Sequence, residues 1–216
     1  MPADFSEQRK NLVNSMEQYG AIGSEEVKSA FLKVPREIFF SIEQRQHSYA
    51  DSAFPIGHGQ TISQPSTIAV MLELLEVRKG MKALEVGSGC GYVLALLSEL
   101  VGGKGKVFGI ELIPELAVFS IKNLKTAGVK NAFVEFGDGT KGMQKKAPFD
   151  RILVSAAAEE VPEALIAQLA PGGRLVAPVG PRHTQQMVVV EKSKKGNVKK
   201  SFPENGYFVF VELRGK

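Results

Sequence analysis

The sequence predicts an α/β fold: a doubly wound, mostly parallel sheet with a C-terminal antiparallel hairpin and an N-terminal helical extension. Three observations predict it. Short runs rich in β-branched residues recur after Gly80, helical patterns separate most of the first five runs, and only a polar turn separates the last two. The runs are 81–86, 106–111, 132–136, 149–155, 173–179, 186–192 and 207–213.

Length and composition are those of a globular protein. The chain has 216 residues, 44% hydrophobic and 23% charged, which excludes disordered and fibrous classes. Cys90 is the single cysteine, so no intramolecular disulfide can form and a reducing compartment is favoured. The first twenty residues lack the apolar core of a signal peptide, and no stretch offers the about 20 apolar residues of a membrane span. We therefore expect a soluble, cytoplasmic monomer with no membrane partner.

Residues 1–79 are the predicted extension and 80–216 the sheet domain, together one compact unit. Two helices are expected at the start of the extension, with Leu12, Met16 and Tyr19 on one face of the first.

The second helix is expected to start at Ser24, which has the side chain of an N-cap, and to end before Pro35. A third is expected over 68–75. Between them, residues 48–66 form an irregular stretch rich in Gly, Pro, Ser and Thr. A long loop without secondary structure inside a compact domain tends to be functional.

In the sheet domain, helical patterns cover 92–100, 114–126 and 161–169, while the gap 137–148 is ambiguous. This alternation is typical of parallel βαβ units. The last two runs are expected to pair as an antiparallel hairpin at one end of the sheet. We interpret the lysines between them as a solvated turn rather than a nucleic-acid patch; they are Lys192, Lys194, Lys195, Lys199 and Lys200.

A glycine-rich loop, 85–91, joins the first strand to its helix. Its spacing differs from the dinucleotide fingerprint, which needs glycine where Tyr92 stands. Glu85, the strand-end residue at which this segment begins, would repel a pyrophosphate and attract a cation. S-adenosylmethionine carries an ammonium and a sulfonium and no phosphate, so the loop, with Gly87 and Gly89, favours that cofactor.

Two further acids follow the next strands. Glu111 ends the second strand, where doubly wound nucleotide sites place a carboxylate on the ribose, and Asp138 follows the third, where a side-chain acceptor could hold an adenine. Taken singly, a glycine turn or a helix-capping acid explains each feature. Taken together on one sheet edge, they favour adenosylmethionine over a phosphate-bearing cofactor or no ligand.

Two motifs before the sheet, 48–51 and 55–65, closely resemble the signature of protein-L-isoaspartate O-methyltransferases. The resemblance covers nearly the whole chain. It continues through 34–37, 83–92, 137–139, 147–152 and 168–175.

The resemblance implies a Rossmann-like class I methyltransferase fold with an extension that contributes to the substrate site. It also implies an enzyme that uses S-adenosylmethionine, with S-adenosylhomocysteine as product. Such enzymes methylate the carboxylate of L-isoaspartyl residues in damaged proteins and peptides, which starts repair to aspartyl.

Site residues follow from the same resemblance. Ser63 corresponds to the family's active-site serine. The implied cofactor contacts are Thr61, Ile62, Ser63, Glu85, Gly87, Gly89, Cys90, Glu111, Leu112, Asp138 and Gly139. The implied substrate contacts are Asp51, Ile56, Thr61, Ser63, Ala156 and Ala157.

The chain departs from the family pattern in three places, the mildest being Phe54, where relatives more often have leucine. Relatives usually end the last strand with Val-Pro-Leu, in a segment that helps to close their pocket, whereas this chain has Glu212 at the middle position. Relatives commonly carry Ser or Thr where this chain has Cys90, which we interpret as a small loop residue rather than a reactive thiol.

Methyl transfer to a carboxylate needs little acid–base help, because a carboxyl with a pKa near about 4 is already ionised at neutral pH. We therefore expect Ser63 to orient the carboxylate by a hydrogen bond. His47, His58 and His183 form no metal-ligand pattern, and no metal is expected.

Two alternatives remain open: an RNA or small-molecule methyltransferase on the same fold, and a non-catalytic descendant that binds adenosylmethionine. No aromatic base-stacking motif is evident, and no nucleic-acid partner is expected.

Overall fold

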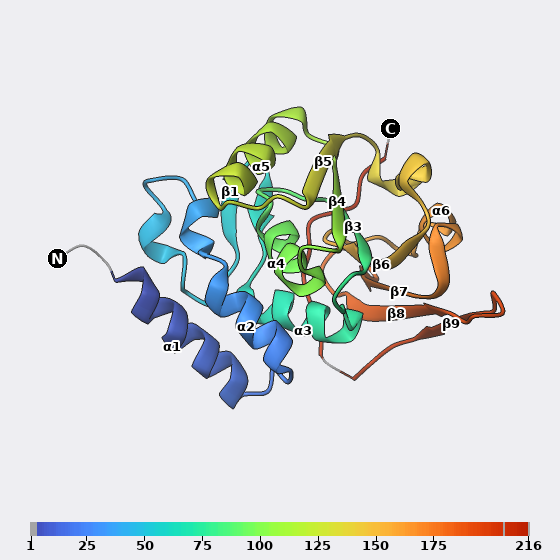
Figure 1. Cartoon of the computed structure of the whole chain (residues 1–216), viewed down its shortest axis with the longest axis horizontal. Helices are drawn as coiled ribbons and strands as arrows, with labels where there is room; N and C mark the ends of the chain where they lie inside the picture. The colour runs from blue at the N-terminus through green and yellow to red at the C-terminus, as the bar shows by residue number, and fades with distance from the viewer. Residues whose placement is uncertain (1–3, 205, 216) are drawn as a thin grey trace.

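The computed structural model describes residues 4–204 and 206–215 and contains a seven-stranded sheet beside a two-stranded one (Figure 1). The order of the large sheet is β5-β4-β3-β6-β7-β8-β9. Its strands are β3 (Lys82–Val86), β4 (Lys106–Glu111), β5 (Ala132–Phe136), β6 (Phe149–Val154), β7 (Leu169–Val179), β8 (Gln186–Lys192) and β9 (Val198–Ser201).

Strands β3 to β7 are parallel, β8 pairs antiparallel with β7, and β9 pairs antiparallel with β8. The strand order reverses at β3, because β4 and β5 follow on one side of it and β6 and β7 on the other. Doubly wound sheets bind ligands at the carboxyl ends of the strands beside such a switch point. The predicted fold class is therefore confirmed, and the fold indicates where to look for a site.

The helices divide unequally between the two faces of the sheet. Helices α3, α4 and α5 cover one face together with the N-terminal pair and η1, while α6, η3 and η4 lie on the other (Figure 1). The helices are α1 (Phe5–Gln18), α2 (Glu25–Lys33), α3 (Pro65–Leu75), α4 (Tyr92–Val101), α5 (Pro114–Thr126) and α6 (Glu163–Ala167). The 3₁₀ turns are η1 (Arg36–Phe39), η2 (Arg45–His47), η3 (Gly139–Lys141) and η4 (Gln144–Lys146).

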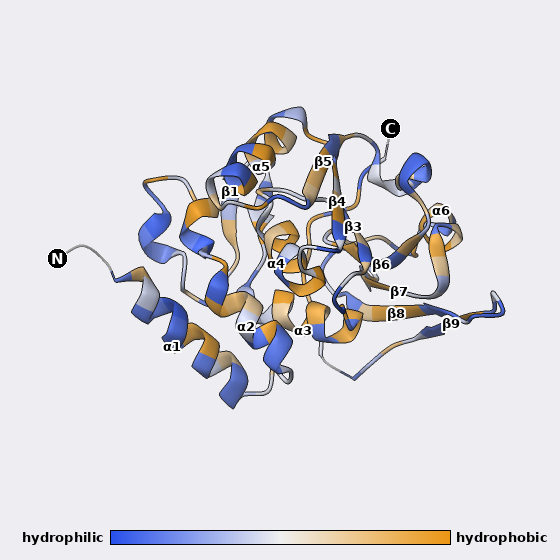
Figure 2. Ribbon diagram, viewed as in Figure 1, coloured by the Kyte–Doolittle hydropathy of each residue, from blue (hydrophilic) through white to orange (hydrophobic). Residues whose placement is uncertain are grey.

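Alternation along each parallel strand supplies both cores. In β3, Ala83 faces the larger core under α4, whereas Leu84 and Val86 face the smaller one. All three side chains are fully buried, which explains why the strand sequence is almost continuously apolar. Helix α1 is amphipathic in a similar way: Figure 2 shows apolar and hydrophilic residues alternating along it.

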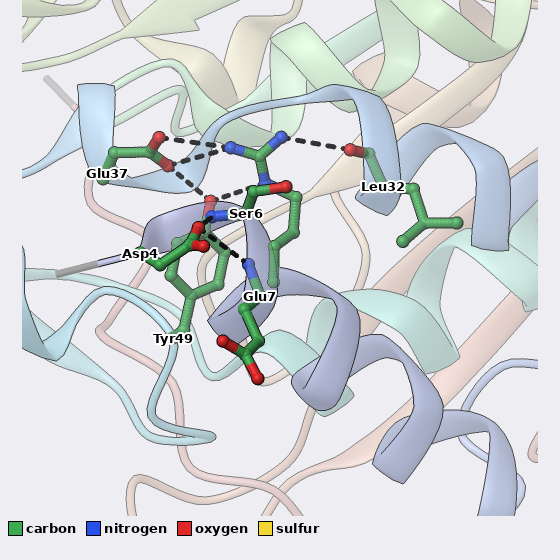
Figure 3. A network of polar contacts seen from close by, with 7 residues as sticks. Asp4, Ser6, Glu7, Leu32, Glu37 and Tyr49 are labelled. Carbon is green, nitrogen blue, oxygen red and sulfur yellow. Dashed lines mark hydrogen bonds and ion pairs between the residues drawn. The ribbon is translucent and has the colours of Figure 1, made fainter.

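Polar side chains attach α1 to the rest of the extension. The Arg9 guanidinium donates to the Tyr49 hydroxyl at 2.7 Å and the Leu32 carbonyl at 3.1 Å, and pairs with Glu37 at 3.1 Å. The Tyr49 hydroxyl also donates to Glu37 (Figure 3). Because Tyr49 belongs to the stretch before α3, this network ties that stretch to α1 and η1.

Helix starts follow the predicted chemistry. The Asp4 carboxylate accepts from the first backbone N–H groups of α1 (Figure 3), and the Ser24 hydroxyl accepts from the Val27 N–H, as its N-cap position predicts. The expectation for Tyr19 is wrong: the residue is 57% exposed, because α1 ends at Gln18 and the hydroxyl donates to Asp51.

The stretch 48–66 is not wholly irregular. It contains an antiparallel hairpin of β1 (Phe54–Gly57) and β2 (Gln60–Ile62). His58 and Gly59, the two turn residues, have φ of 54° and 71°. Two consecutive positive φ values match the twist of a hairpin, which explains how so short a turn closes it.

The predicted pairing of the last two runs is wrong. Strand β8 pairs across the short turn at 193–197 with β9, and β9 itself contains Lys199 and Lys200. The run 207–213 instead crosses the carboxyl ends of the parallel strands: Phe208 exchanges backbone bonds with Gln185, and Ala157 pairs with Val211 and Leu213. Pairing β8 with β9 requires a shorter loop than pairing it with the run 207–213. The run 207–213 therefore remains available to cover the strand ends.

None of the helices among the described residues is both long and apolar enough to cross a membrane.

Candidate active site

The glycine loop after β3 makes a tight turn against the end of β4. The Gly87 N–H donates to the Ile110 carbonyl at 2.9 Å, and Gly87, Gly89 and Gly91 have φ of 83°, 51° and 89°. A Cβ on Gly91 would lie 2.5 Å from the Ser120 hydroxyl oxygen, so only glycine fits there. The loop therefore exposes main chain where a side chain would otherwise stand.

Glu111 locks this loop to the next strand. Its Oε2 accepts from the Gly89 N–H at 2.8 Å and its Oε1 from the Ile113 N–H at 3.0 Å, with the side chain buried. Each oxygen keeps a second lone pair. The carboxylate is therefore held in place before any ligand hydroxyl reaches it.

Glu85 is a buried carboxyl with one oxygen unsatisfied. Its Oε1 accepts from the Ser155 hydroxyl at 2.7 Å, and its Oε2 has no hydrogen-bond partner in the described part of the chain. Burial raises the pKa of Glu85 to about 8, helped by the nearby Glu111 and opposed by the Ser155 hydrogen bond. A cation bound nearby would favour the ionised form.

A cavity opens above these groups, and we call it the strand-end cavity. It lies between the glycine loop, the ends of β3, β4 and β6, and the C-terminal run. Its lining residues are Gln60, Thr61, Val86, Gly87, Gly89, Ile110, Glu111, Leu112, Ile113, Gly139, Ser155, Ala156, Val211, Glu212, Leu213 and Arg214.

A wider groove of about 660 Å³ adjoins that cavity. Its walls come from the end of α1, the start of α3 and the C-terminal run. They are formed by Tyr19, Gly20, Ala21, Ala53, Thr61, Ser63, Gln64, Ser66, Thr67, Val70, Ser155, Tyr207, Phe208, Val209, Phe210 and Val211. Thr61, Ser155 and Val211 line both hollows, so the groove and the strand-end cavity meet at these residues.

Ser63 lies beside this junction, in the two-residue link between β2 and α3. Its carbonyl accepts from the Arg36 guanidinium at 2.8 Å. Asp51 fixes the other end of the link by accepting from the Ser66 N–H at 2.8 Å and from the Gln64 amide at 3.2 Å. Asp51 thus caps α3, whose own N-cap residue provides no side-chain hydrogen bond.

The structure brings most predicted cofactor contacts to the strand-end cavity. Those that line it are Thr61, Gly87, Gly89, Glu111, Leu112 and Gly139, with Glu85 buried behind its wall. Gly139 packs closely, since a Cβ there would lie 2.5 Å from a Val86 methyl.

Four other predicted contacts lie outside the lining, and one of them, Ser63, lines the adjoining groove instead. Ile62 and Cys90 are buried, and the Cys90 carbonyl accepts from the Asn123 amide at 3.0 Å. Asp138 accepts from the Thr140 N–H and hydroxyl and pairs with Lys141 at 3.0 Å, so its carboxylate caps η3.

The predicted substrate contacts are also divided. Ala156 lines the strand-end cavity, and Ala157 holds the C-terminal run through backbone bonds at Val211 and Leu213. Ile56 lies over the glycine loop, with its Cδ1 3.2 Å from the place of a Cβ on Gly89. Asp51 supports α3 and does not line the groove.

The backbone pairing also explains how Glu212 is accommodated. Ala157 bonds to the Val211 carbonyl and the Leu213 N–H, and the ladder does not use the Glu212 N–H. A proline at this position would therefore cost no hydrogen bond of this ladder. The Glu212 side chain is exposed at the rim of the strand-end cavity.

Sequence reasoning missed several wall residues. Ser155 lines both hollows and bonds to Glu85; its place directly after β6, beside the switch point, is a signal that could have identified it. Tyr19 and Tyr207 reach the groove from segments far apart in the chain, and no local sequence pattern predicts their place there.

A doubly wound sheet, an acid beneath a glycine loop without a phosphate fingerprint, and a second acid on the next strand end define a Rossmann-like class I methyltransferase. The family model of protein-L-isoaspartate(D-aspartate) O-methyltransferase matches residues 7–215. The chain belongs to that family.

Individual relatives agree. A protein-L-isoaspartate O-methyltransferase from Methanopyrus kandleri is 48% identical over 98% of this chain and 93% of its own, and one from Pyrococcus abyssi is 46% identical over 99% and 97%. A Plasmodium falciparum protein-L-isoaspartate O-methyltransferase, solved in complex with S-adenosyl-L-homocysteine, superposes with a TM-score of 0.82. It is 27% identical and covers 95% of this chain and 98% of its own.

Proposed function

We infer that this chain transfers the methyl group of S-adenosylmethionine to the carboxylate of L-isoaspartyl residues in damaged proteins and peptides, which starts their return to aspartyl. Family membership supports the reaction. The observation that carries it is the junction at Thr61, Ser155 and Val211, where a cavity suited to the cofactor meets an open groove suited to a peptide.

The residues present fit the cofactor. The Glu85 Oε2 is a buried oxygen without a hydrogen-bond partner, and a bound cation would favour its ionised form; the Glu111 carboxylate is fixed for hydroxyls, and the glycine loop leaves room for close approach. When bound, S-adenosylmethionine supplies an electrophilic methyl group on a sulfonium. We propose that Glu85 and Glu111 hold it, with Gly87, Gly89 and Gly139 against its surface.

The groove residues position the acceptor. An isoaspartyl carboxylate is ionised at neutral pH, so no side chain has to remove a proton. Ser63 and Thr61 offer hydroxyl donors at the junction, and we assign Ser63 the orienting hydrogen bond. The C-terminal run, held at Gln185 and Ala157, covers the strand ends and limits water there.

The remaining predicted contacts are assigned by what they touch. Cys90, Ile62 and Asp138 support the walls from behind, and Asp51 supports the groove by fixing the start of α3. Residues 1–79 thereby supply much of the substrate groove and residues 80–216 most of the strand-end cavity. Action as a cytoplasmic monomer stays a prediction.

The test is transfer of labelled methyl from S-adenosylmethionine to a short peptide with one L-isoaspartyl residue. The control is the same peptide with normal L-aspartate. We expect base-labile label on the first peptide alone. No transfer to either, with S-adenosylhomocysteine still binding, would overturn the substrate and leave a different acceptor or a non-catalytic binding protein.

A further inference from the structure

Arg36 is a fully buried arginine beside the groove, at the start of η1. Its Nε donates to the Ser48 carbonyl at 2.9 Å and its Nη2 to the Ser63 carbonyl at 2.8 Å. Its Nη1 has no partner in the described part of the chain. One side chain thus joins the two ends of the segment that carries the β1–β2 hairpin.

The charge of Arg36 is not balanced by an acid. Among residues 4–204 and 206–215 no carboxylate forms an ion pair with it; instead its guanidinium lies 4.8 Å from the Tyr92 ring centre and 5.4 Å from that of Phe40. Burial lowers the pKa of Arg36, yet an arginine stays protonated at neutral pH.

Stability alone does not account for this arrangement. Buried charges are costly, and apolar residues of similar volume often stabilise a protein as well or better. What an apolar residue cannot do is donate two directed, charge-assisted hydrogen bonds to carbonyls fifteen positions apart in the chain.

Arg151 in β6 offers a matched comparison within the same chain. It is 7% exposed, donates to the Glu76 and Asp150 carbonyls at 3.0 and 2.8 Å, and likewise forms no ion pair among the described residues. Its bonds reach the end of α3 away from Ser63. Both arginines donate hydrogen bonds to backbone carbonyls, but only Arg36 bonds to the link between β2 and α3 that contains Ser63.

We propose that Arg36 is a positioning residue for methyl transfer, which fixes the Ser63 carbonyl and so holds Thr61 and Ser63 at the junction of the groove and the strand-end cavity. The reaction itself is the one proposed above, and this role rests on it. Lysine can reach one of the two carbonyls, so it would restore part of the function.

The test compares Arg36→Met, Arg36→Lys and Arg151→Met with the wild type by steady-state kinetics on the isoaspartyl peptide and calorimetric binding of S-adenosylhomocysteine. We expect Arg36→Met to lower kcat/KM about 30-fold and Arg36→Lys about fivefold, with cofactor affinity changed less than about threefold. Arg151→Met should keep kcat/KM within about twofold even where its Tm falls.

Hydrogen exchange of the 48–64 amides gives a readout independent of turnover. Exchange should rise about tenfold in Arg36→Met and stay unchanged in Arg151→Met. If Arg36→Met does not fold, Arg36→Lys carries the same comparison.

Equal losses of kcat/KM in the two methionine variants, parallel losses of activity and cofactor affinity in the Arg36 variants, or unchanged exchange would overturn the role of Arg36. A wild type inactive on the peptide would overturn the proposed function instead, and the exchange data would still decide whether Arg36 holds the segment.

Discussion

The strand-end cavity and the groove are neighbours built in different ways. Regular strands position the cavity's key groups, since Glu85 and Glu111 stand at the ends of β3 and β4. Each acid is next in sequence to a buried apolar residue, Val86 or Ile110. Most of the groove is built from segments outside the large sheet: the end of α1, residues 53–70 and the C-terminal run. Its shape depends on bonds between residues far apart in the chain.

That difference has a consequence for mutation. A change in the cavity removes a ligand-binding group from a rigid frame, and the loss should appear in cofactor affinity. A change in the groove loosens a wall, and the loss should appear in turnover or in KM for the peptide. The following substitutions separate the two, in order of expected effect.

Glu111→Ala should weaken S-adenosylhomocysteine binding about 100-fold, or about 2.7 kcal/mol, because it removes the bonds to Gly89 and Ile113 as well as the acceptor for a ribose. Calorimetry measures this. Glu115→Ala, an exposed acid in the first turn of α5, is the control and should bind normally. Normal binding by Glu111→Ala would place the cofactor elsewhere.

Ser63→Ala should lower kcat for the isoaspartyl peptide about 30-fold, since it removes a hydroxyl that orients the acceptor. Cofactor affinity should change less than about twofold, because Ser63 lines the groove alone. Ser15→Ala, exposed on α1, serves as control. Equal loss of turnover and cofactor affinity would mean that Ser63 belongs to the cavity.

S-adenosylhomocysteine binding should tighten as pH rises toward 8, up to about tenfold per pH unit below the pKa of Glu85, because its cationic ammonium favours the ionised carboxyl. Burial raises that pKa above the unfolded value to about 8. The unliganded fold therefore binds more protons than the unfolded chain between those values, and Glu85 costs stability progressively as pH rises through that window.

Glu85→Gln tests the assignment. It should flatten the affinity profile between about pH 6 and 8 and remove this group's contribution to the pH dependence of unfolding. Calorimetry across pH measures the first and denaturant titration the second. An unchanged affinity profile would mean that Glu85 does not face the ammonium.

Gln185→Ala should raise KM for the peptide about threefold with kcat and cofactor affinity nearly unchanged. The buried Gln185 amide accepts from the Phe210 N–H at 2.8 Å and donates to the Pro181 carbonyl, and so holds one wall of the groove. Gln186→Ala, the exposed neighbour in β8, should leave KM unchanged. A larger loss in cofactor affinity than in KM would link this wall to the cavity.

Much of the molecule could be predicted because the signals were local. Five parallel strands, the helices at 92 and 114 and the capping serine at 24 all follow from periodicity and turn chemistry. Where prediction failed, a contact with a residue far away in the chain was the cause. Tyr19 is exposed and donates a hydrogen bond to Asp51, and the run 207–213 lies outside the large sheet because β9 takes the place beside β8.

The sequence by itself determined that the acids at the strand ends, Glu85 and Glu111, and the glycine loop lie together. They do so because parallel strands all end at one edge of the sheet. Only the tertiary structure decided what encloses that edge. Arg36, Asp51 and Gln185 each fix a segment far away in the chain, and such bonds depend on how segments pack rather than on any local pattern. The strand-end cavity could therefore be predicted largely from the sequence, whereas the walls of the groove depend on tertiary packing.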